Sequence, residues 1–169
     1  MSHVEHREAA PDQVGVAVIT VSDTRDRDSD KSGGLIRERL TGAGHKVVHY
    51  AIVKDTARQI KGEMAMALEK GGCQALILNG GTGIAPRDNT FEVVDNMLDK
   101  RLPGFGEIFR ALSFEEIGAA AIMSRATAGT YRGRILISLP GSTGAVRLAM
   151  DKLILPELAH LVHTISPRR

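Results

Sequence analysis

The residues with the clearest capacity for chemistry form the glycine-rich segment Asn79-Gly80-Gly81-Thr82-Gly83, which is followed by Arg87 and Asp88. Three glycines within four residues allow positive φ angles and a close approach of backbone to ligand. Successive backbone N–H groups in such a loop can bind an anion, Thr82 adds a hydroxyl, and Arg87 can contact a phosphate. The segment therefore indicates a loop that holds a phosphate-bearing small molecule.

Two common nucleotide-binding patterns do not describe this loop. A Walker loop requires Gly-Lys followed by Ser or Thr, and a Rossmann fingerprint requires G-x-G-x-x-G at the start of a helix. Neither pattern occurs at 79–88. An ordinary strand-to-helix turn that uses glycine for its conformational freedom stays open as an alternative.

Asp55 and Asp88 are the candidate catalytic groups, because each follows an apolar run on the expected binding edge. Two carboxylates that face a polyphosphate repel it unless a cation lies between them, and Mg²⁺ binds carboxylates together with phosphate oxygens. We therefore expect Asp55 and Asp88 to hold Mg²⁺. In the alternative, Asp55 stabilises a helix N-terminus and Asp88 pairs with Arg87 or caps a helix.

Small and polar residues also follow two other apolar runs. Ser22 and Asp23 come after the first run, and Pro140-Gly141-Ser142 comes after the last one. We expect these residues to contribute to the same site. The remaining aspartates of the segment after Asp23 alternate with basic residues, which is typical of a solvated loop; they are Asp26, Asp28 and Asp30.

Four apolar runs supply the strands that must position these groups. They are residues 14–21, 46–53, 74–78 and 134–139; the first is rich in β-branched side chains, and the third is the shortest and most apolar. Such runs are typical of strands that are buried on both faces.

Helices are predicted between the strands from apolar residues at helical spacing. The segment Thr56–Gln59 has the form of a capping box. The pattern over 113–133 is the weakest, and both a helix and a small hairpin fit it. The predicted helices start at Ser32, Thr56, Asn89 or Thr90, near Phe105, and near Val146, the last being bent or broken at Pro156.

The alternation of strands and helices predicts an α/β fold, a three-layer structure whose mostly parallel, doubly wound sheet carries helices on both faces. In open parallel sheets, ligands bind beyond the carboxyl ends of the strands. Because all four strands end in small, polar or acidic residues, we expect a single site at that edge.

The chain as a whole fits one domain, expected over residues 14–165 after a disordered tail over 1–13. Its single cysteine cannot form an internal disulfide and suits a reducing cytoplasm, where we expect the protein. The net charge is +2 and there are only six aromatic residues, so a nucleic-acid partner is not expected. No apolar run approaches the roughly 20 residues that cross a bilayer, so no membrane partner is expected either.

With these residues placed, the sequence resembles the MogA/MoaB family of molybdenum cofactor biosynthesis proteins from about Val14 to Ile165. The run over 109–118 and the ending Pro140–Thr143 resemble the MoaB branch. The motifs that carry the resemblance are Val21-Ser22-Asp23, Gly80-Gly81-Thr82-Gly83, Arg87-Asp88, Pro103-Gly104-Phe105-Gly106-Glu107 and Leu139-Pro140-Gly141-Ser142.

The resemblance implies molybdopterin adenylylation, in which ATP, Mg²⁺ and molybdopterin give adenylyl-molybdopterin and pyrophosphate. It places the two acidic positions of the family on Asp55 and Asp88. We expect the pterin near Ser22, Asp23 and the 140–142 turn, with Glu107 and Arg125 as further candidates. It also implies a homotrimer or a dimer of trimers (a homohexamer), and other cofactor biosynthesis proteins as partners.

Two other functions stay open at this point. The chain could be a non-catalytic molybdopterin carrier or scaffold of the same pathway. It could also be an unrelated sugar-phosphate or nucleotide enzyme, because one fold serves many functions.

Overall fold

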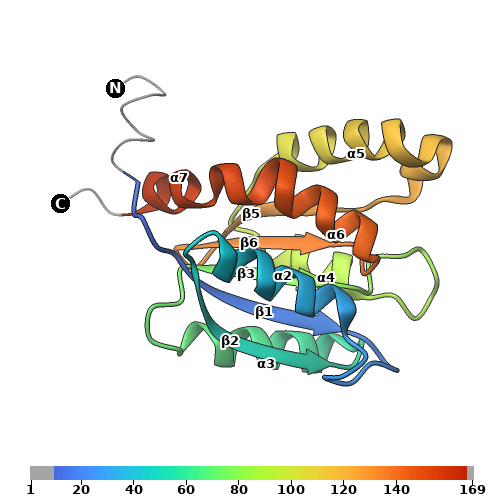
Figure 1. Ribbon diagram of the computed structural model, residues 1–169. Coiled ribbons are helices and arrows are strands. Elements are labelled where there is room, and N and C mark those ends of the chain that lie inside the picture. The colour runs from blue at the N-terminus through green and yellow to red at the C-terminus, as the bar shows by residue number, and fades with distance from the viewer. Residues whose placement is uncertain (1–9, 167–169) are drawn as a thin grey trace.

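The computed structural model describes residues 10–166, so most of the predicted tail over 1–13 lies outside the described residues. Its centre is a six-stranded sheet in the order β2-β1-β3-β6-β5-β4 (Figure 1). β1 pairs in parallel with both β2 and β3, and β3 pairs in parallel with β6. These four strands are the predicted ones; their bounds are Gly15–Val21 (β1), Lys46–Val53 (β2), Ala75–Asn79 (β3) and Arg134–Leu139 (β6).

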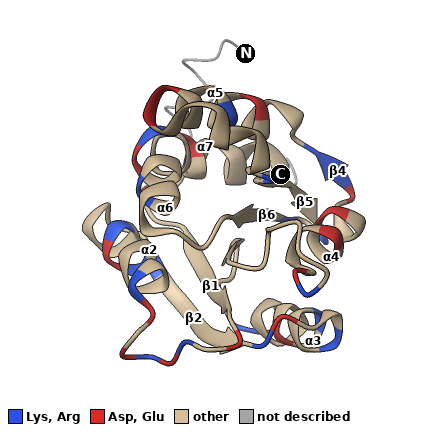
Figure 2. Ribbon diagram, turned by 90° about the vertical axis from the view of Figure 1, so that its right-hand side faces the viewer, with Lys and Arg blue, Asp and Glu red and all other residues tan. Residues whose placement is uncertain are grey.

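Helices cover both faces of the sheet, which confirms the predicted three-layer α/β fold (Figure 2). On one face lie α2 (Lys31–Gly42), α5 (Pro103–Ile117), α6 (Thr143–Ala149) and α7 (Leu155–Ile165). On the other lie α3 (Ala57–Leu68) and α4 (Thr90–Met97). Among the described residues, no helix combines the length and the apolar composition needed to cross a membrane.

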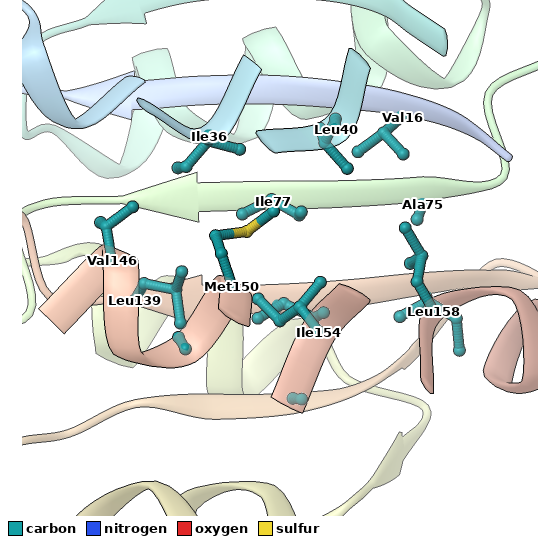
Figure 3. Close-up of a cluster of buried hydrophobic side chains, with 14 of the residues drawn as sticks. Val16, Ile36, Leu40, Ala75, Ile77, Leu139, Val146, Met150, Ile154 and Leu158 are labelled. Carbon is teal, nitrogen blue, oxygen red and sulfur yellow. The ribbon is translucent and has the colours of Figure 1, made fainter. Parts of the chain in front are cut away.

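The core consists of two apolar layers, because β1 and β3 are buried along their whole length. Alternate residues of each strand therefore point into different layers. Figure 3 shows one layer, in which Met150 reaches toward Ile77 of β3 and Ile36 of α2 lies nearby. This packing on both faces explains why the strands appear in the sequence as continuous apolar runs.

Two helix starts follow the sequence signals closely. Asp30 caps α2 by accepting a hydrogen bond from the Gly33 N–H at 3.0 Å. Thr56 caps α3 by accepting from the Gln59 N–H at 3.3 Å. The side chain of Gln59 accepts from the Lys54 N–H instead of closing the reciprocal bond of a capping box. It thereby fixes the chain where it leaves β2.

The segment over 113–133 contains both of the elements that fitted its sequence. α5 continues to Ile117, a short 3-10 turn, η1 (Gly118–Met123), follows, and β5 (Thr127–Tyr131) then forms an antiparallel hairpin with β6. The hairpin turns at Arg132 and Gly133, whose φ angles of 46° and 71° are both positive, as in the tight turns that suit strand twist. The unpredicted strand β4 (Lys100–Arg101) has two exposed residues, too few to show a periodic pattern.

The last predicted helix is interrupted, as its proline indicated. A π-helical turn, η2 (Met150–Ile154), separates α6 from α7, and Pro156 lies in the first turn of α7. Proline cannot donate a backbone hydrogen bond, so the helix adjusts its turn directly before it. The bend keeps Ile154 and Leu158 in the same core layer.

Candidate functional site

A cavity of about 490 Å³ opens at the carboxyl ends of β1, β3 and β6. This is the edge at which parallel α/β sheets bind ligands. Three predicted segments line it, namely 22–23, 80–83 and 140–142, and so do the side chains of Asp55, Arg87 and Asp88. The structure thus brings most of the predicted site residues into one cavity.

The glycine loop is held against its neighbouring strands. The Gly80 N–H donates to the carbonyl oxygen of Leu139 at 3.0 Å, which ties the loop to β6. A Cβ atom on Gly80 would lie 2.2 Å from the Val21 carbonyl oxygen, and the φ angle of Gly80 is 96°. Only glycine fits both the space and the backbone conformation at this position.

Gly81 and Gly83 leave room for the carboxylates of Asp55 and Asp88, a structural role that could not be predicted from the sequence. A Cβ on Gly81 would lie 2.4 Å from Oδ2 of Asp55, and a Cβ on Gly83 would lie 2.4 Å from Oδ2 of Asp88. The carboxylates of Asp55 and Asp88 therefore pack directly against the loop expected to bind phosphate. The glycines permit this contact because they have no side chains.

The carboxylate of Asp55 is the most constrained acidic group of the cavity. Its Oδ1 accepts from the Asn89 N–H at 3.0 Å and from the Thr90 hydroxyl at 3.4 Å. Burial raises the pKa of Asp55, and the negative charges of Asp88 and Asp23 raise it further, against the lowering effect of these hydrogen bonds. The fold thus holds an ionised group where it is unfavourable, which is typical of functional sites.

Replacing Asp55 by Asn is therefore expected to stabilise the protein near pH 7. The pKa of Asp55 is higher in the folded protein than in the unfolded chain, so ionisation of Asp55 favours unfolding. The free energy of unfolding therefore falls as the pH rises through the folded-state pKa. We expect a gain of about 0.5–1 kcal/mol in the free energy of unfolding at pH 7. That gain should disappear below the unfolded pKa of 3.8, and urea titrations at both pH values measure it.

Asp28→Asn is the matched control, because Asp28 is an exposed aspartate outside the cavity whose replacement changes the net charge equally. It should leave the stability nearly unchanged at both pH values. Equal gains for the two variants would show that overall charge, and not the cavity, is responsible.

Asp88, Asp23 and Arg87 are further charged groups of the cavity. Oδ2 of Asp88 accepts from the Ala85 N–H at 3.1 Å, which closes the glycine loop on itself. Oδ1 of Asp23 accepts from the Asp55 N–H at 3.1 Å, and its Oδ2 lies 3.8 Å from the guanidinium of Arg87. Within residues 10–166 no group of three or more His, Cys, Asp or Glu side chains is arranged to hold a metal ion.

Ser22 and the 140–142 turn also line the cavity. The Ser22 hydroxyl oxygen accepts from the Arg25 N–H at 3.1 Å, and that of Ser142 caps α6 by accepting from the Ala145 N–H at 3.2 Å. Each oxygen thus shapes its own turn, while each hydroxyl proton stays available to a ligand.

Three predicted binding residues lie outside the cavity lining. Asn79 is fully buried beneath the glycine loop, where its amide bonds to Ser32 and Thr20. Arg125 donates to the carbonyl oxygens of Thr82 and Gly83 and pairs with Glu92, so it supports the loop from outside. Glu107 is exposed on α5 and borders a different depression. Where the side chains of these three residues lie could not be read from spacing alone.

The sequence also missed one wall of the cavity. This wall comes from α5 and η1, and it is mostly apolar; it consists of Phe109, Ser113, Ile117, Ala120, Met123 and Ser124. Its residues fall in or beside the segment whose pattern was weakest. The turn at Gly118, with a φ of 64°, brings η1 back toward the strand ends, and that glycine was the available signal.

The interpretation of residues 26–30 as a solvated loop was wrong for Asp30. Its side chain is only 3% exposed, and it accepts hydrogen bonds from Thr20 and Tyr50. Arg25, from the same loop, lines the cavity. The single signal for Asp30 was its position one residue before α2, where aspartate is a preferred cap.

Known proteins share this architecture. A family model described as a probable molybdopterin binding domain matches residues 17–160. Molybdenum cofactor biosynthesis protein B of Halalkalibacterium halodurans is 54% identical over 170 residues, which cover 100% of both chains. The protein of the same name from Bacillus subtilis is 53% identical, over 98% of each chain. The crystal structure of tungsten cofactor synthesizing protein MoaB from Pyrococcus furiosus superposes with a TM-score of 0.84 at 38% identity, covering 92% of this chain and 99% of that one.

Proposed function

Because the chain belongs to the family of molybdopterin-binding domains and has a role in molybdenum cofactor biosynthesis, we propose that it is a molybdopterin adenylyltransferase. It would join ATP and molybdopterin to give adenylyl-molybdopterin and pyrophosphate. The observation that carries this proposal is the packing of the Asp55 and Asp88 carboxylates against Gly81 and Gly83 inside one cavity. That arrangement suits the transfer of an adenylyl group from ATP.

The reaction needs positioning more than it needs proton transfer. A phosphate monoester oxygen of molybdopterin attacks the α-phosphorus of ATP, and the bond from that phosphorus to the bridging oxygen of pyrophosphate breaks. The attacking oxygen is already anionic, so a strong general base is unnecessary. Catalysis then depends on alignment and on stabilising the charge that develops. The backbone N–H groups of the loop and the fixed carboxylates supply a rigid frame for it.

Asp55 and Asp88 would hold Mg²⁺ in this proposal, as the sequence predicted. Their donor chemistry fits, because two carboxylates together with phosphate oxygens form the oxygen-rich set that Mg²⁺ prefers. The mutual repulsion that raises the pKa of Asp55 also fits, since a bound cation relieves it. When bound, Mg²⁺ would neutralise phosphate charge; the protein's own share is to fix both carboxylates beside the loop.

The two walls of the cavity suggest how the substrates would be arranged. The glycine loop and the carboxylates would bind the phosphates, whereas Phe109, Ile117 and Met123 offer an apolar surface to a flat ring. Ser22, Asp23 and the 140–142 turn would supply hydrogen bonds to the pterin. A cavity with one polar, charged wall and one apolar wall suits a ligand with one ionic end and one aromatic end.

The proposal is tested by mixing the purified protein with molybdopterin, ATP and Mg²⁺ and measuring pyrophosphate release. We expect release that requires all three components and produces adenylyl-molybdopterin in equal amount. Calorimetric measurement of the binding of each ligand distinguishes a transferase from a non-catalytic carrier. Tight binding of molybdopterin without any binding of ATP would support the carrier and contradict the transferase.

We also propose that the chain forms a homotrimer, alone or paired into a hexamer. The support is a group of exposed large apolar side chains on α5 and η1, which is typical of an interaction surface. It consists of Ile108, Phe114 and Ile122, each 53–82% exposed.

Introducing charge into this apolar surface is expected to dissociate the oligomer. Phe114→Asp combined with Ile122→Asp places two like charges in a contact that excludes water, and association should weaken by more than about 100-fold. Light scattering during size-exclusion chromatography measures the mass. Met66→Asp on α3 is the control, since Met66 is equally exposed but lies on the other face of the sheet. A double variant that keeps its assembly would show that α5 and η1 do not form the interface.

A further inference from the structure

A chain of polar side chains runs beneath the cavity, in a region that is otherwise apolar. Arg25 donates to the Ser32 hydroxyl at 2.6 Å, and Ser32 donates to Oδ1 of Asn79 at 2.8 Å. The amide nitrogen of Asn79 donates to Thr20 at 2.9 Å, and Thr20 donates to Oδ2 of Asp30 at 2.6 Å. Thr20, Ser32 and Asn79 are 0% exposed.

The chain has one direction, because a serine or threonine hydroxyl has a single proton to donate. The proton of Thr20 goes to Asp30, so the oxygen of Thr20 accepts from Asn79. The proton of Ser32 goes to Asn79, so the oxygen of Ser32 accepts from Arg25. A carboxylate thus stands at the accepting end of the chain and a guanidinium at the donating end, and the two ends also face each other, with Nη1 of Arg25 3.8 Å from Oδ1 of Asp30. These two charges fix the orientation of every group between them.

Asp30 is firmly held as the negative end. Burial by itself raises the pKa of Asp30, but hydrogen bonds from Thr20, Tyr50 and Gly33, together with the positive charge of Arg25, outweigh that effect and bring the pKa below its ordinary value. The Tyr50 hydroxyl donates to Oδ2 at 2.7 Å. Asp30 is therefore ionised at neutral pH, although it has no direct contact with the cavity.

Arg25 is the positive end, and it reaches the cavity. Its second terminal nitrogen donates to the Gly141 carbonyl oxygen at 3.1 Å, and a Cβ on Gly141 would lie 3.1 Å from Cα of Gly80. Arg25 therefore joins the 140–142 turn to the buried chain at the point where that turn meets the glycine loop. Two of its five N–H groups donate to Ser32 and Gly141, and Nη1 also lies 3.8 Å from Asp30, which leaves further N–H groups for a ligand.

Arg25 is also the better fixed of the two arginines that line the cavity. Its side chain is 33% exposed, whereas that of Arg87 is 72% exposed and lies near Asp23. The same cavity holds the carboxylates of Asp23, Asp55 and Asp88. An anionic ligand that enters it needs a cation of fixed position, and Arg25 is the residue that the fold supplies.

The geometry points to Arg25 as a binding residue for a phosphate of the ligand. It points to Asp30 as the residue that positions Arg25, both by their direct ion pair and through Thr20, Asn79 and Ser32. The inference rests on the proposed function for the identity of the ligands, which are molybdopterin and ATP. It does not rest on the adenylylation step itself.

Calorimetric titration of molybdopterin and of ATP, each alone, tests the role of Arg25. Arg25→Gln should raise the Kd of the ligand whose phosphate it binds by about 10- to 100-fold, the range expected for a lost charge-assisted hydrogen bond. Arg27→Gln is the control, since Arg27 lies on the same loop and removes the same charge but does not line the cavity. It should change neither Kd by more than about twofold. Weaker binding of one ligand identifies the source of the phosphate, and unchanged Kd values for both overturn the assignment.

A double-mutant cycle tests whether Asp30 acts through Arg25. Asp30→Asn keeps the shape of the side chain and its cap on α2 but removes the charge, and it should weaken the same ligand about 5- to 10-fold. Added to Arg25→Gln, it should cause no further loss. An equal loss in both backgrounds would mean a general effect on the fold and would overturn the positioning role. Ser32→Ala interrupts the chain with a smaller structural change and should give the same pattern if Asp30→Asn fails to fold.

These measurements separate failure of this inference from failure of the proposed function. A wild-type protein that binds both ligands but releases no pyrophosphate contradicts adenylylation, while the comparison of Arg25→Gln with Arg27→Gln still decides the role of Arg25. An active wild-type protein with unchanged affinity in Arg25→Gln contradicts the role of Arg25 alone. A wild-type protein that binds neither ligand contradicts both.

Discussion

Replacing Asp88 by Asn is expected to reduce kcat for pyrophosphate release by at least about 10²- to 10³-fold, the effect typical of losing one electrostatic contact to a transition state. The structure gives a reason to expect that the fold survives. Oδ2 of Asp88 accepts a hydrogen bond from the Ala85 N–H, and an asparagine oxygen can accept the same bond. The substitution therefore removes charge from the cavity while it keeps the shape of the loop.

The titration of Asp55 in the metal-free protein should change as well, because the charge of Asp88 is one cause of the raised pKa of Asp55. Without that charge the pKa of Asp55 should fall. NMR titration of the Asp55 carboxyl carbon in the absence of Mg²⁺ measures this shift. Asp28→Asn, which changes the net charge equally outside the cavity, should leave both the turnover and the pKa of Asp55 as in the wild type. Full turnover by Asp88→Asn would remove Asp88 from the mechanism.

The strands and the binding edge could be predicted because they depend on local patterns. Strands that are buried on both faces require continuous apolar runs, and parallel strands bring their carboxyl ends to one edge. That reasoning found the glycine loop, Asp55, Asp88 and the 140–142 turn without knowledge of any contact. The cavity confirms that these segments meet, although it does not establish what each residue does.

The remaining features depend on contacts between distant parts of the chain, which spacing does not report. Asp30 and Asn79 are 49 positions apart, yet both contact Thr20 and Ser32 in the interior. From the sequence, only its position directly before a helix separated Asp30 from the exposed aspartates beside it, and nothing separated Asn79 from a ligand-binding amide. Both are polar residues whose meaning depends on burial, and burial is decided by how the helices pack on the sheet.

The glycine loop illustrates the same limit most clearly. Its composition indicated close approach of backbone to ligand. Gly81 also leaves room for the carboxylate of Asp55, which follows β2, and Gly83 leaves room for that of Asp88 at the end of the same loop. The nearest atoms to a Cβ on Gly81 are Oγ1 of Thr90 at 2.1 Å and Oδ2 of Asp55 at 2.4 Å. Glycine is thus required here by the site itself as well as by the turn.

Gly81→Ala is accordingly expected to impair both stability and turnover. The φ angle of Gly81 is 65°, which costs a residue with a Cβ about 1–2 kcal/mol. Crowding against Thr90 and Asp55 adds about 1–3 kcal/mol, the usual range for overpacking. The carboxylate of Asp55 must move to admit the methyl group, and a displacement of about 1 Å at a reacting centre can reduce the rate about 100-fold.

Two other glycines separate strain from crowding in this experiment. Gly62 in α3 has neither a positive φ nor an atom within 4 Å of its Cβ position, so Gly62→Ala should stabilise the protein by about 0.5–1 kcal/mol. Gly44 after α2 has a φ of 85° and the same open space, so Gly44→Ala should cost only the strain. Both variants should retain full turnover. Gly81→Ala could instead lose only as much thermal stability as Gly44→Ala and turn over at the wild-type rate. The loop would then accommodate the methyl group without moving Asp55, and the close contact between Gly81 and the Asp55 carboxylate would not be needed for the reaction.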